Sequence, residues 1–392
     1  MSSAERVLLV HNAYQLAGGE DSVVAAELAL LRDKGHEVIE MRRDNQQIRA
    51  MGRASLTAQT LWSCGSQAEA QALLRTHRPA LVHVHNTFPL ISPSLYWACA
   101  KAGVPVVQTL HNFRLACPQA MFLRDGKVCE ACLGKTPWPA LAHGCYRDSR
   151  VQTAAVVGML ALHRTLHTFE RKVTRYIALN EFCKSKFVQA GLPAQRIAVK
   201  PNFAAVAAPT GQFAREGLLF VGRLSAEKGI EVLAQAWAEC LGLGLRLRVV
   251  GSGPLDASLD SLAGFELVGN RTPDQVLAEM ASAVALVLPS ICYENFPRTL
   301  VEAFGAGLPV IASRIGSLAE LVDHGLTGLL FNAGDATDLA RTMRWAHEHP
   351  EEMAAMGRNA RARYESHYTP DINYRQLRAI YRDAIDDNQR EA

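Results

Sequence analysis

The sequence predicts an α/β protein built from two doubly wound, parallel-sheet domains. Three observations lead to this fold class. At 392 residues the chain is too long for one compact core. Short apolar runs alternate with stretches of helical spacing, as in βαβ units. This alternation occurs twice, on either side of an Ala-, Pro- and Gly-rich stretch at residues 201–217, which we interpret as the interdomain linker.

The first series begins with an apolar run at residues 6–10, as expected of a strand buried on both faces. A turn with Gly18 and Gly19 follows, and residues 21–34 then have the apolar spacing of a helix. We expect further strands at 37–41, 80–84, 104–110 and 176–179, and helices at 94–102 and 151–174. The alternation of strand and helix patterns stops at 112–150, a loop-rich stretch with four of the nine cysteines. We therefore assign 1–205 to the N-terminal domain, with a Cys-rich insertion at 112–150.

The second series has the same alternation of apolar runs and helical stretches. Its expected strands are 218–221, 245–250, 284–288 and 310–312, and its expected helices are 228–240, 273–281 and 297–304. Residues 206–370 thus form the C-terminal domain, and 371–392 are expected to be a helix that packs back on the N-terminal domain. Two such halves joined by a linker suit a ligand held between the carboxyl ends of two sheets.

Composition places the chain among ordinary globular proteins, with 49% hydrophobic and 20% charged residues and a net charge of +3. Residues 1–205 hold 24 Lys and Arg against 14 Asp and Glu, whereas the remainder holds 17 against 24. The basic first half indicates an anionic partner, either a phosphate-bearing substrate or a membrane surface, unless surface charge drifted by chance. We expect no nucleic-acid partner.

No secretory signal or membrane-spanning run is present, so we expect a cytoplasmic protein, peripheral at the inner face of the membrane if it binds one.

The strongest chemical signal lies at residues 289–307. Glu294 follows a strand in a loop, and Glu302 stands eight residues later inside the expected helix. Pro297 suits the first helical turn, where its missing N–H is no loss. The helix N-terminus suits a diphosphate, and the two carboxylates suit the hydroxyls of a sugar and a ribose.

With its neighbours, this pattern resembles the Glu-x7-Glu signature of the retaining glycosyltransferase family 4, on the GT-B fold of two Rossmann-like domains facing across a cleft. The flanking segments that are similar include Gly222-Arg223, Lys228-Gly229, residues 250–255, 306–312 and 325–331. The resemblance implies that Arg223 and Lys228 bind the donor diphosphate, where fixed positive charge stabilises the leaving group. It also implies that Glu294 contacts the transferred sugar and Glu302 the ribose.

The resemblance assigns further residues around the donor. The donor-binding residues that it implies, beyond Glu302, are Gly18, Gly19, Gly222, Gly251, Asn270, Arg271, Asn295, Phe296, Pro297, Arg298, Thr299 and Leu300. Because Pro297 has no N–H, we expect one phosphate contact either to be missing or to be supplied by Arg298 or Thr299. His111 follows a strand of the first domain and is expected near the sugar carbon that reacts. His83 and His85, on a neighbouring strand, are expected as wall or core.

The function implied is transfer of a hexose-type sugar, with retained configuration, from a UDP- or GDP-sugar to a glycan or lipid-linked acceptor, in cell-surface polysaccharide or lipopolysaccharide synthesis. No metal or other cofactor is expected in the catalysis. Two alternatives stay open: a sugar-nucleotide epimerase or hydrolase of the same fold, and a non-catalytic nucleotide-sugar-binding protein.

Two features fall outside this scheme. Cys117, Cys129, Cys132 and Cys145 have the spacing of a tetrahedral structural zinc site, with His143 as a substitute ligand; an Fe–S cluster, a redox disulfide and four reduced thiols are the alternatives. Residues 151–175 are apolar first and basic later. They predict either contact with an anionic membrane or an ordinary helix with a basic face.

Overall fold

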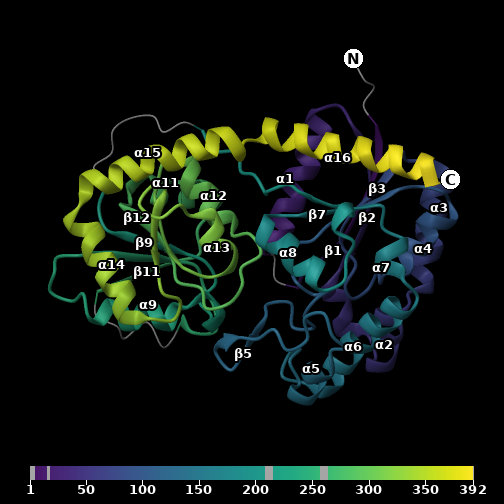
Figure 1. Cartoon of the computed structure of the whole chain (residues 1–392), viewed down its shortest axis with the longest axis horizontal. Helices are drawn as coiled ribbons and strands as arrows, with labels where there is room; N and C mark the ends of the chain where they lie inside the picture. Colours follow the sequence, from purple (N-terminus) through teal and green to yellow (C-terminus); the bar gives the residue numbers. More distant parts are fainter. Residues whose placement is uncertain (1–4, 16–17, 208–214, 257–263, 392) are drawn as a thin grey trace. The chain divides into compact units, whose positions relative to one another are not determined.

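The computed structural model describes residues 5–15, 18–207, 215–256 and 264–391, and these fold as two units (Figure 1). Unit 1 holds the described residues of Met1–Met121, Glu130–Pro201 and Asn373–Ala392. Unit 2 holds those of Phe122–Cys129 and Asn202–Ile372. Part of the expected linker, residues 208–214, lies outside the described residues. The expected insertion at 112–150 is divided, because 122–129 belongs to unit 2.

Unit 1 is built on a six-stranded parallel sheet with the order β2-β1-β3-β4-β7-β8. Its strands are β1 (Arg6–Ala13), β2 (Glu37–Asp44), β3 (Leu81–Asn86), β4 (Val106–Thr109), β7 (Arg175–Ala178) and β8 (Ile197–Val199). Its helices and 3₁₀ turns are α1 (Gly19–Asp33), η1 (Asn45–Ala50), α2 (Arg53–Leu61), α3 (Cys64–His77), α4 (Ser94–Lys101), α5 (Trp138–His143), α6 (Arg150–Thr165), α7 (Thr168–Arg171), α8 (Glu181–Gln189) and η2 (Ala194–Arg196).

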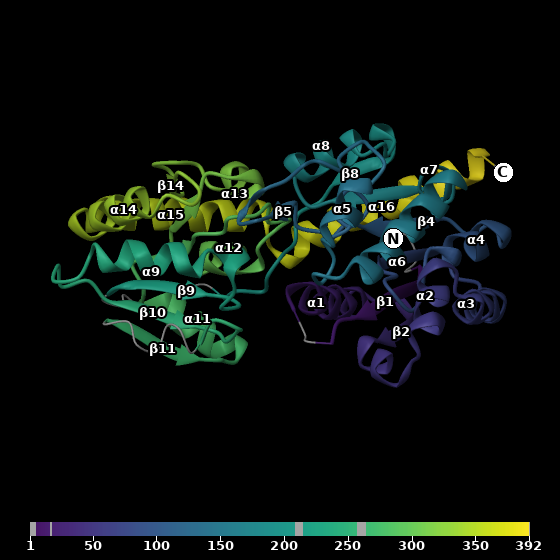
Figure 2. The same ribbon diagram turned by 90° about the horizontal axis from the view of Figure 1, so that it is seen from below.

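Unit 2 has a second six-stranded parallel sheet with the order β11-β10-β9-β12-β13-β14, of which β9, β10 and β11 can be followed in Figure 2. Its strands are β9 (Leu218–Val221), β10 (Leu247–Val250), β11 (Phe265–Gly269), β12 (Ala285–Leu288), β13 (Val310–Ser313) and β14 (Gly328–Phe331). Its helices are η3 (Ala226–Lys228), α9 (Ile230–Ala238), α11 (Pro273–Ser282), α12 (Arg298–Gly305), α13 (Gly316–Leu321), α14 (Ala336–Glu348) and α15 (Pro350–His367). The hairpin of β5 (Leu123–Arg124) and β6 (Lys127–Val128) is also assigned to this unit.

The two sheets confirm the predicted fold class of two Rossmann-like, doubly wound halves. In each sheet the strand order reverses beside the first strand, β1 in unit 1 and β9 in unit 2. Loops that leave neighbouring strands at such a point run to opposite faces of the sheet, and the space that they leave at the carboxyl ends suits a ligand. The candidate site residues of each unit lie at these ends.

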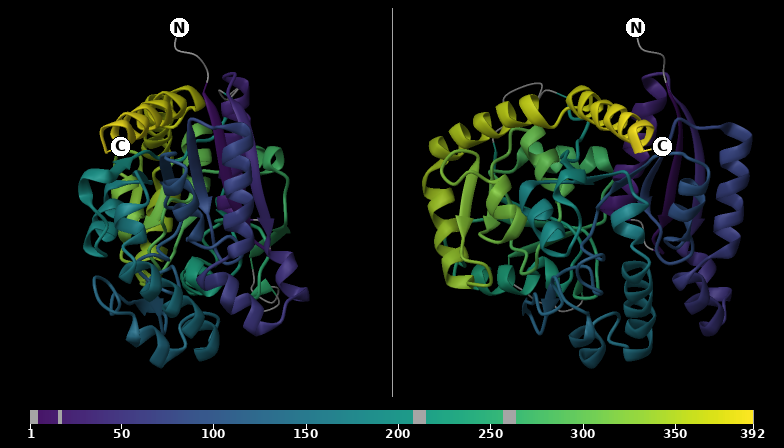
Figure 3. Two further views of the ribbon diagram at one scale, coloured as in Figure 1. Left: turned by 90° about the vertical axis from the view of Figure 1, so that its right-hand side faces the viewer. Right: turned by 45° about the vertical axis from the view of Figure 1, so that its right-hand side comes forward.

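The last helix, α16 (Pro370–Glu391), covers one face of the unit 1 sheet over residues 373–391 (Figure 3). Leu377, Ile380 and Tyr381 pack into one buried cluster with Val7 of β1 and Leu81 of β3. Burial of such side chains contributes about 1.5–3 kcal/mol each. The C-terminal segment is therefore part of the N-terminal core.

The strands β8, β11 and β14 were not predicted, and one of the predicted elements differs clearly in the structure. The single helix expected at 151–174 is two helices, α6 and α7, with His167 between them in the left-handed region at φ 52°. The buried His163 ring explains the break, since Nε2 contacts the Leu61 carbonyl at 2.9 Å and Nδ1 contacts the Thr168 hydroxyl at 3.0 Å. A helix that continued past residue 166 would carry that hydroxyl away from the ring.

The apolar side of α6 packs into the protein interior, because Val156, Met159 and Leu160 are buried. Val151 is 72% exposed at its start. Within the described ranges, no helix combines the length and the apolar character that crossing a membrane requires.

One glycine fixes the junction between η3 and the end of β12. Gly229 has φ 71°, and a Cβ at this position would lie 1.8 Å from the Pro289 carbonyl oxygen. Only glycine fits such a close approach of two backbone segments. Lys228 is thereby held beside the loop that carries Glu294.

We expect Gly229→Ala to lower the free energy of unfolding by about 3 kcal/mol, because backbone strain and a steric clash add together. Gly244→Ala is the matched control, since Gly244 also has φ 71° but its Cβ would meet nothing within 4 Å. It should lower the free energy by about 1 kcal/mol. Urea unfolding curves measure both, and equal losses would show that the Pro289 contact is unimportant.

Candidate functional site

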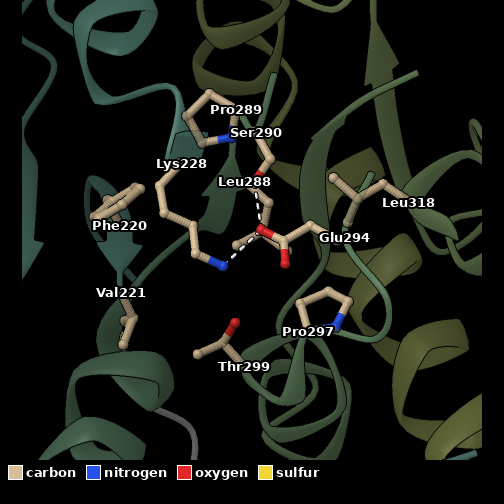
Figure 4. A pocket seen from close by; sticks show the side chains of 10 residues that line it. All are labelled: Phe220, Val221, Lys228, Leu288, Pro289, Ser290, Glu294, Pro297, Thr299 and Leu318. Atoms are coloured by element: carbon tan, nitrogen blue, oxygen red, sulfur yellow. Dashed lines mark hydrogen bonds and ion pairs between the residues drawn. The ribbon is translucent and has the colours of Figure 1, made fainter. Parts of the chain in front are cut away.

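A pocket in unit 2 is organised by an ion pair between Lys228 and Glu294 (Figure 4). Lys228 Nζ lies 2.6 Å from Glu294 Oε1, which also accepts a hydrogen bond of 2.7 Å from the Ser290 hydroxyl. Pro297 and Thr299 line the same pocket, and Figure 4 shows the Thr299 hydroxyl directed toward the pair. The pocket thus presents a cation, a carboxylate and a hydroxyl together.

The local backbone holds the Glu294 loop in place. The amide of Ile291 donates to the carbonyl of Glu227 at 3.1 Å, and the Ser317 hydroxyl donates to the Glu294 carbonyl at 2.7 Å. These bonds tie the loop after β12 to η3 on one side and to α13 on the other. The carboxylate is therefore positioned before any ligand binds.

Both members of the pair are charged at neutral pH. Burial alone would raise the pKa of Glu294, but the charge and hydrogen bond of Lys228 and the hydrogen bond of Ser290 hold that pKa below its ordinary value. Burial likewise favours the neutral amine of Lys228, yet Glu294 outweighs it and raises the pKa of the amine. The side chains of Lys228 and Glu294 remain 32% and 13% exposed, so the ion pair is accessible to a ligand.

The second glutamate of the motif has a different partner. Glu302 Oε1 lies 2.9 Å from Arg298 Nε, one helical turn earlier on α12. Burial raises the pKa of Glu302, and Arg298 opposes that rise. The expected phosphate contact from Arg298 would have to replace this pairing. Pro297 is the N-cap of α12, one position before the first turn where the sequence placed it.

The remaining donor-binding predictions in unit 2 fall into three groups. Phe296 and Leu300 are buried, so only their backbone groups are available to a donor, and Asn295 is 9% exposed. Backbone packing explains why glycine occurs at positions 222 and 251, because a Cβ on Gly251 would lie 1.9 Å from the Gly222 carbonyl oxygen. The exposed residues outside the lining of the pocket are Arg223, Asn270 and Arg271.

In unit 1, Gly18 and Gly19 begin α1. Gly18 is the N-cap with φ −129°, and a Cβ on either glycine would meet nothing within 4 Å. Neither backbone conformation nor packing therefore requires glycine at these two positions. A role in the close approach of a ligand stays a prediction.

Several polar side chains gather around this helix start, among them the two acids of its first turn, which the sequence suggests as helix-start acids or acceptor contacts. The Tyr14 hydroxyl donates to Glu20 Oε2 at 2.8 Å, and the Asn112 amide lies 3.3 Å from the same oxygen. Burial raises the pKa of Glu20 to about 7. Asp21 differs, because the hydrogen bonds from His11 and Gly18 outweigh burial and lower its pKa. The pKa values of these two adjacent carboxyl groups are thus shifted in opposite directions.

His111 lies two residues beyond β4, half-buried, next to Asn112. His83 and His85 lie inside β3 rather than at its end, and both are buried. They share the interior with two groups that the sequence analysis missed, Glu27 of α1 and Lys200 after β8, each 1% exposed. A signal for Glu27 was present: it stands four residues after Val23, on the face of α1 that the apolar residues occupy.

The four cysteines of the predicted zinc site are not assembled. Among the described residues, Glu27, His83 and His85 form the one group of three or more ligand atoms within 4.8 Å of one another. No three of Cys117, Cys129, Cys132 and Cys145 meet that spacing, which a shared tetrahedral ion requires. The zinc site therefore stays a prediction, and no step of the chemistry below uses it.

Comparison with known proteins connects this geometry to a family. The family model described as Glycosyltransferase Family 4 matches residues 17–207, and the model described as Glycosyl transferases group 1 matches residues 215–349. D-rhamnosyltransferase WbpZ of Pseudomonas aeruginosa is 33% identical over 159 residues, which are 38% of this chain and 41% of that protein. The D-inositol 3-phosphate glycosyltransferase of an Arthrobacter species is 34% identical over 165 residues, 39% of this chain and 38% of that protein. The matches thus span less than half the length of these relatives.

Solved structures share the fold over nearly the whole chain. The sucrose-phosphate synthase of Thermosynechococcus elongatus superposes with a TM-score of 0.72 at 18% identity, covering 96% of this chain and 98% of that one. The Anabaena protein HepE, crystallised with UDP-glucose, gives a TM-score of 0.67 at 18% identity, covering 96% and 99%. At this identity the likeness establishes the fold.

The raised pKa of Glu20 predicts a specific pH dependence of stability. Because the folded state holds the proton of Glu20 up to about pH 7, wild-type stability should fall as the pH rises through the interval between the unfolded and folded pKa values. Glu20→Gln has no such proton to lose. Its melting temperature relative to wild type should therefore increase between pH 5 and pH 8, by about 2 °C or more.

Asp33→Asn, on the exposed part of the same helix, is the control. Melting curves across the pH range by circular dichroism measure all three proteins. A difference between Glu20→Gln and wild type that stays constant with pH would show that Glu20 does not retain its proton.

Proposed function

Because the chain belongs to glycosyltransferase family 4, we propose that it transfers a hexose-type sugar from a nucleotide-sugar donor to a glycan or lipid-linked acceptor, with retention of the anomeric configuration. The donor is a UDP- or GDP-sugar, and the setting is cell-surface polysaccharide or lipopolysaccharide synthesis. Relatives with names from such synthesis, including the amylovoran glycosyltransferase AmsK of Erwinia amylovora at 29% identity over 177 residues, support this proposal.

The observation that carries the proposal is the Lys228–Glu294 pair in the pocket beside the start of α12. A nucleotide-sugar has an anionic diphosphate joined to a ring of hydroxyls. Lys228 offers the diphosphate a positive charge, and the first N–H groups of α12 offer it hydrogen bonds. Glu294 offers the sugar a carboxylate that accepts hydrogen bonds from hydroxyl groups. The two halves of the ligand thus match the two halves of the pair.

The proposed reaction breaks the bond between the anomeric carbon and the phosphate oxygen, and the electron pair leaves with the diphosphate. Lys228 stabilises the negative charge that develops there. The acceptor oxygen attacks the same face of the sugar, and its proton passes to the departing phosphate oxygen. Glu294 orients the sugar during this step, and it gains hydrogen-bond partners as Lys228 turns toward the phosphate.

A membrane contact for a lipid-linked acceptor is a secondary proposal. The support is limited to Trp138 on α5, 66% exposed, and Val151 on α6, 72% exposed, which lie in the basic first half of the chain. Apolar and basic side chains together suit an anionic lipid surface. The membrane contact therefore depends on the ends of α5 and α6, rather than on the buried face of α6.

We expect Lys228→Met and Glu294→Gln each to lower kcat about 100-fold, the loss typical when one group that stabilises the transition state is removed. A screen of UDP, GDP, ADP and their sugar conjugates by thermal shift first identifies the donor, since a ligand of the folded state raises its melting temperature. Arg246→Met is the matched control, because Arg246 forms an exposed ion pair with Glu216 in the same unit.

The products separate the alternatives. Transfer to an acceptor supports the proposal, whereas release of nucleotide or isomerised sugar without acceptor would identify a hydrolase or an epimerase. Donor binding that persists in Glu294→Gln without any turnover of wild type would identify a binding protein. Wild-type kcat in both pocket variants would refute the role of the Lys228–Glu294 pair.

A further inference from the structure

A chain of polar side chains runs through the interior of unit 1 and ends at His111. Its charged end is the ion pair of Lys200 Nζ and Glu27 Oε2, 3.1 Å apart, with Asn373 Oδ1 also 3.1 Å from the ammonium. Burying two charges is costly, and the cost is offset where each charge has a close partner and further hydrogen bonds. The chain continues from the other oxygen of Glu27.

That other oxygen, Oε1, faces two imidazole rings of β3. His83 Nδ1 lies 3.1 Å away and His85 Nε2 lies 3.5 Å away. His83 is further held by the Tyr381 hydroxyl at 2.7 Å from Nδ1 and by the Thr109 hydroxyl at 2.8 Å from Nε2. Contacts on both of its nitrogens therefore fix the His83 ring.

The three residues that face one another here could ligate a metal ion by their spacing. Lys200 argues against that use, because its ammonium already neutralises the Glu27 carboxylate. A divalent cation on Glu27 would lie next to this buried positive charge. The Glu27 carboxylate is thus already neutralised by an ion pair, with two imidazole rings beside its second oxygen.

His85 connects this group to His111. His85 Nδ1 lies 2.8 Å from His111 Nε2, and the two rings stack with their centroids 5.1 Å apart. One proton must lie between these nitrogens. Burial lowers the pKa of His85 well below its ordinary value and lowers that of His111 to about 3, so each ring is neutral and carries one proton.

The position of Glu27 decides which ring donates. A carboxylate oxygen only accepts hydrogen bonds, so the favourable tautomer of His85 has its proton on Nε2, toward Glu27. His85 Nδ1 is then bare and accepts from the Nε2–H of His111. His111 is left with a bare Nδ1. The opposite assignment would place the lone pair of His85 Nε2 against the carboxylate.

We propose that Glu27 and His85 are positioning residues, which hold His111 in the tautomer that presents a bare Nδ1 as hydrogen-bond acceptor to a hydroxyl of the bound sugar substrate. The identity of that ligand rests on the proposed glycosyl transfer, whereas the tautomer itself does not. His111 is half-buried, whereas His83 and His85 are buried. His85 and Glu27 act through His111 from the interior.

Two substitutions of His85 separate positioning from packing. In His85→Asn, the amide oxygen replaces Nδ1 as an acceptor for the His111 N–H. In His85→Phe, the ring that stacks on His111 remains but has no nitrogen. We expect kcat within about 5-fold of wild type for His85→Asn and about 100-fold lower for His85→Phe, with the donor KM changed less than about 3-fold in both. His347→Phe, an exposed position on α14, is the matched control.

The tautomer is measured directly by long-range ¹H–¹⁵N correlation spectra of the full chain with ¹⁵N-labelled histidine and no substrate. His111→Gln assigns the signal by its loss. We expect the wild-type His111 proton on Nε2, the same in His85→Asn, and a loss of that preference in His85→Phe. A wild-type His111 proton on Nδ1 would overturn the proposal, and so would an unchanged kcat in a folded His85→Phe.

This readout is independent of turnover. If no donor and acceptor pair supports transfer but the spectra show the expected tautomers, the proposed function fails and the positioning by Glu27 and His85 stands. If transfer is found but His111 has the other tautomer, the positioning fails and the proposed function stands.

Discussion

The ion pair of Lys200 and Glu27 is the interaction on which unit 1 depends. It joins α1 to the segment after β8. The same ammonium also donates a hydrogen bond to Asn373, which connects α16, at the far end of the sequence, to the pair. An unpaired charge in this interior would cost several kcal/mol. The three segments are therefore stable only when all of them are in their native positions. The same carboxylate orients the histidines of β3, so the requirements of folding and of the candidate site coincide at one residue.

In unit 2, close packing of backbone segments, rather than a buried ion pair, positions the residues of the candidate site. Gly229 lies against the Pro289 carbonyl, and Gly251 lies against the Gly222 carbonyl, both at the carboxyl ends of the parallel strands. Close backbone contact leaves few conformations for the side chains that follow, and Lys228 and Glu294 consequently meet at 2.6 Å. Glycines in this unit therefore belong to the site although their role is steric.

The sequence was informative wherever a property repeats along the chain. Apolar runs and helical spacing predicted most strands of both sheets, because strands buried on two faces have few polar residues, but β8, β11 and β14 were not among them. The Glu294 loop and the helix with Glu302 were predictable from a local pattern. The partners of Glu27 were not, since Lys200 and Asn373 lie 173 and 346 residues away in sequence and neither belongs to a pattern. The break at His167 depends on Leu61 and Thr168 together, which local periodicity cannot show.

The Lys200–Glu27 and Lys228–Glu294 ion pairs differ in their exposure to water. Lys200 and Glu27 are each 1% exposed, and Asn373 also contacts the ammonium, so their charges stabilise a single arrangement. Lys228 and Glu294 are 32% and 13% exposed, and their pocket is also lined by two hydroxyl side chains and the start of a helix. A ligand can therefore compete for the second pair and not for the first. Accessibility, rather than the presence of opposite charges, distinguishes the pair that we propose to bind substrate from the pair that holds the fold.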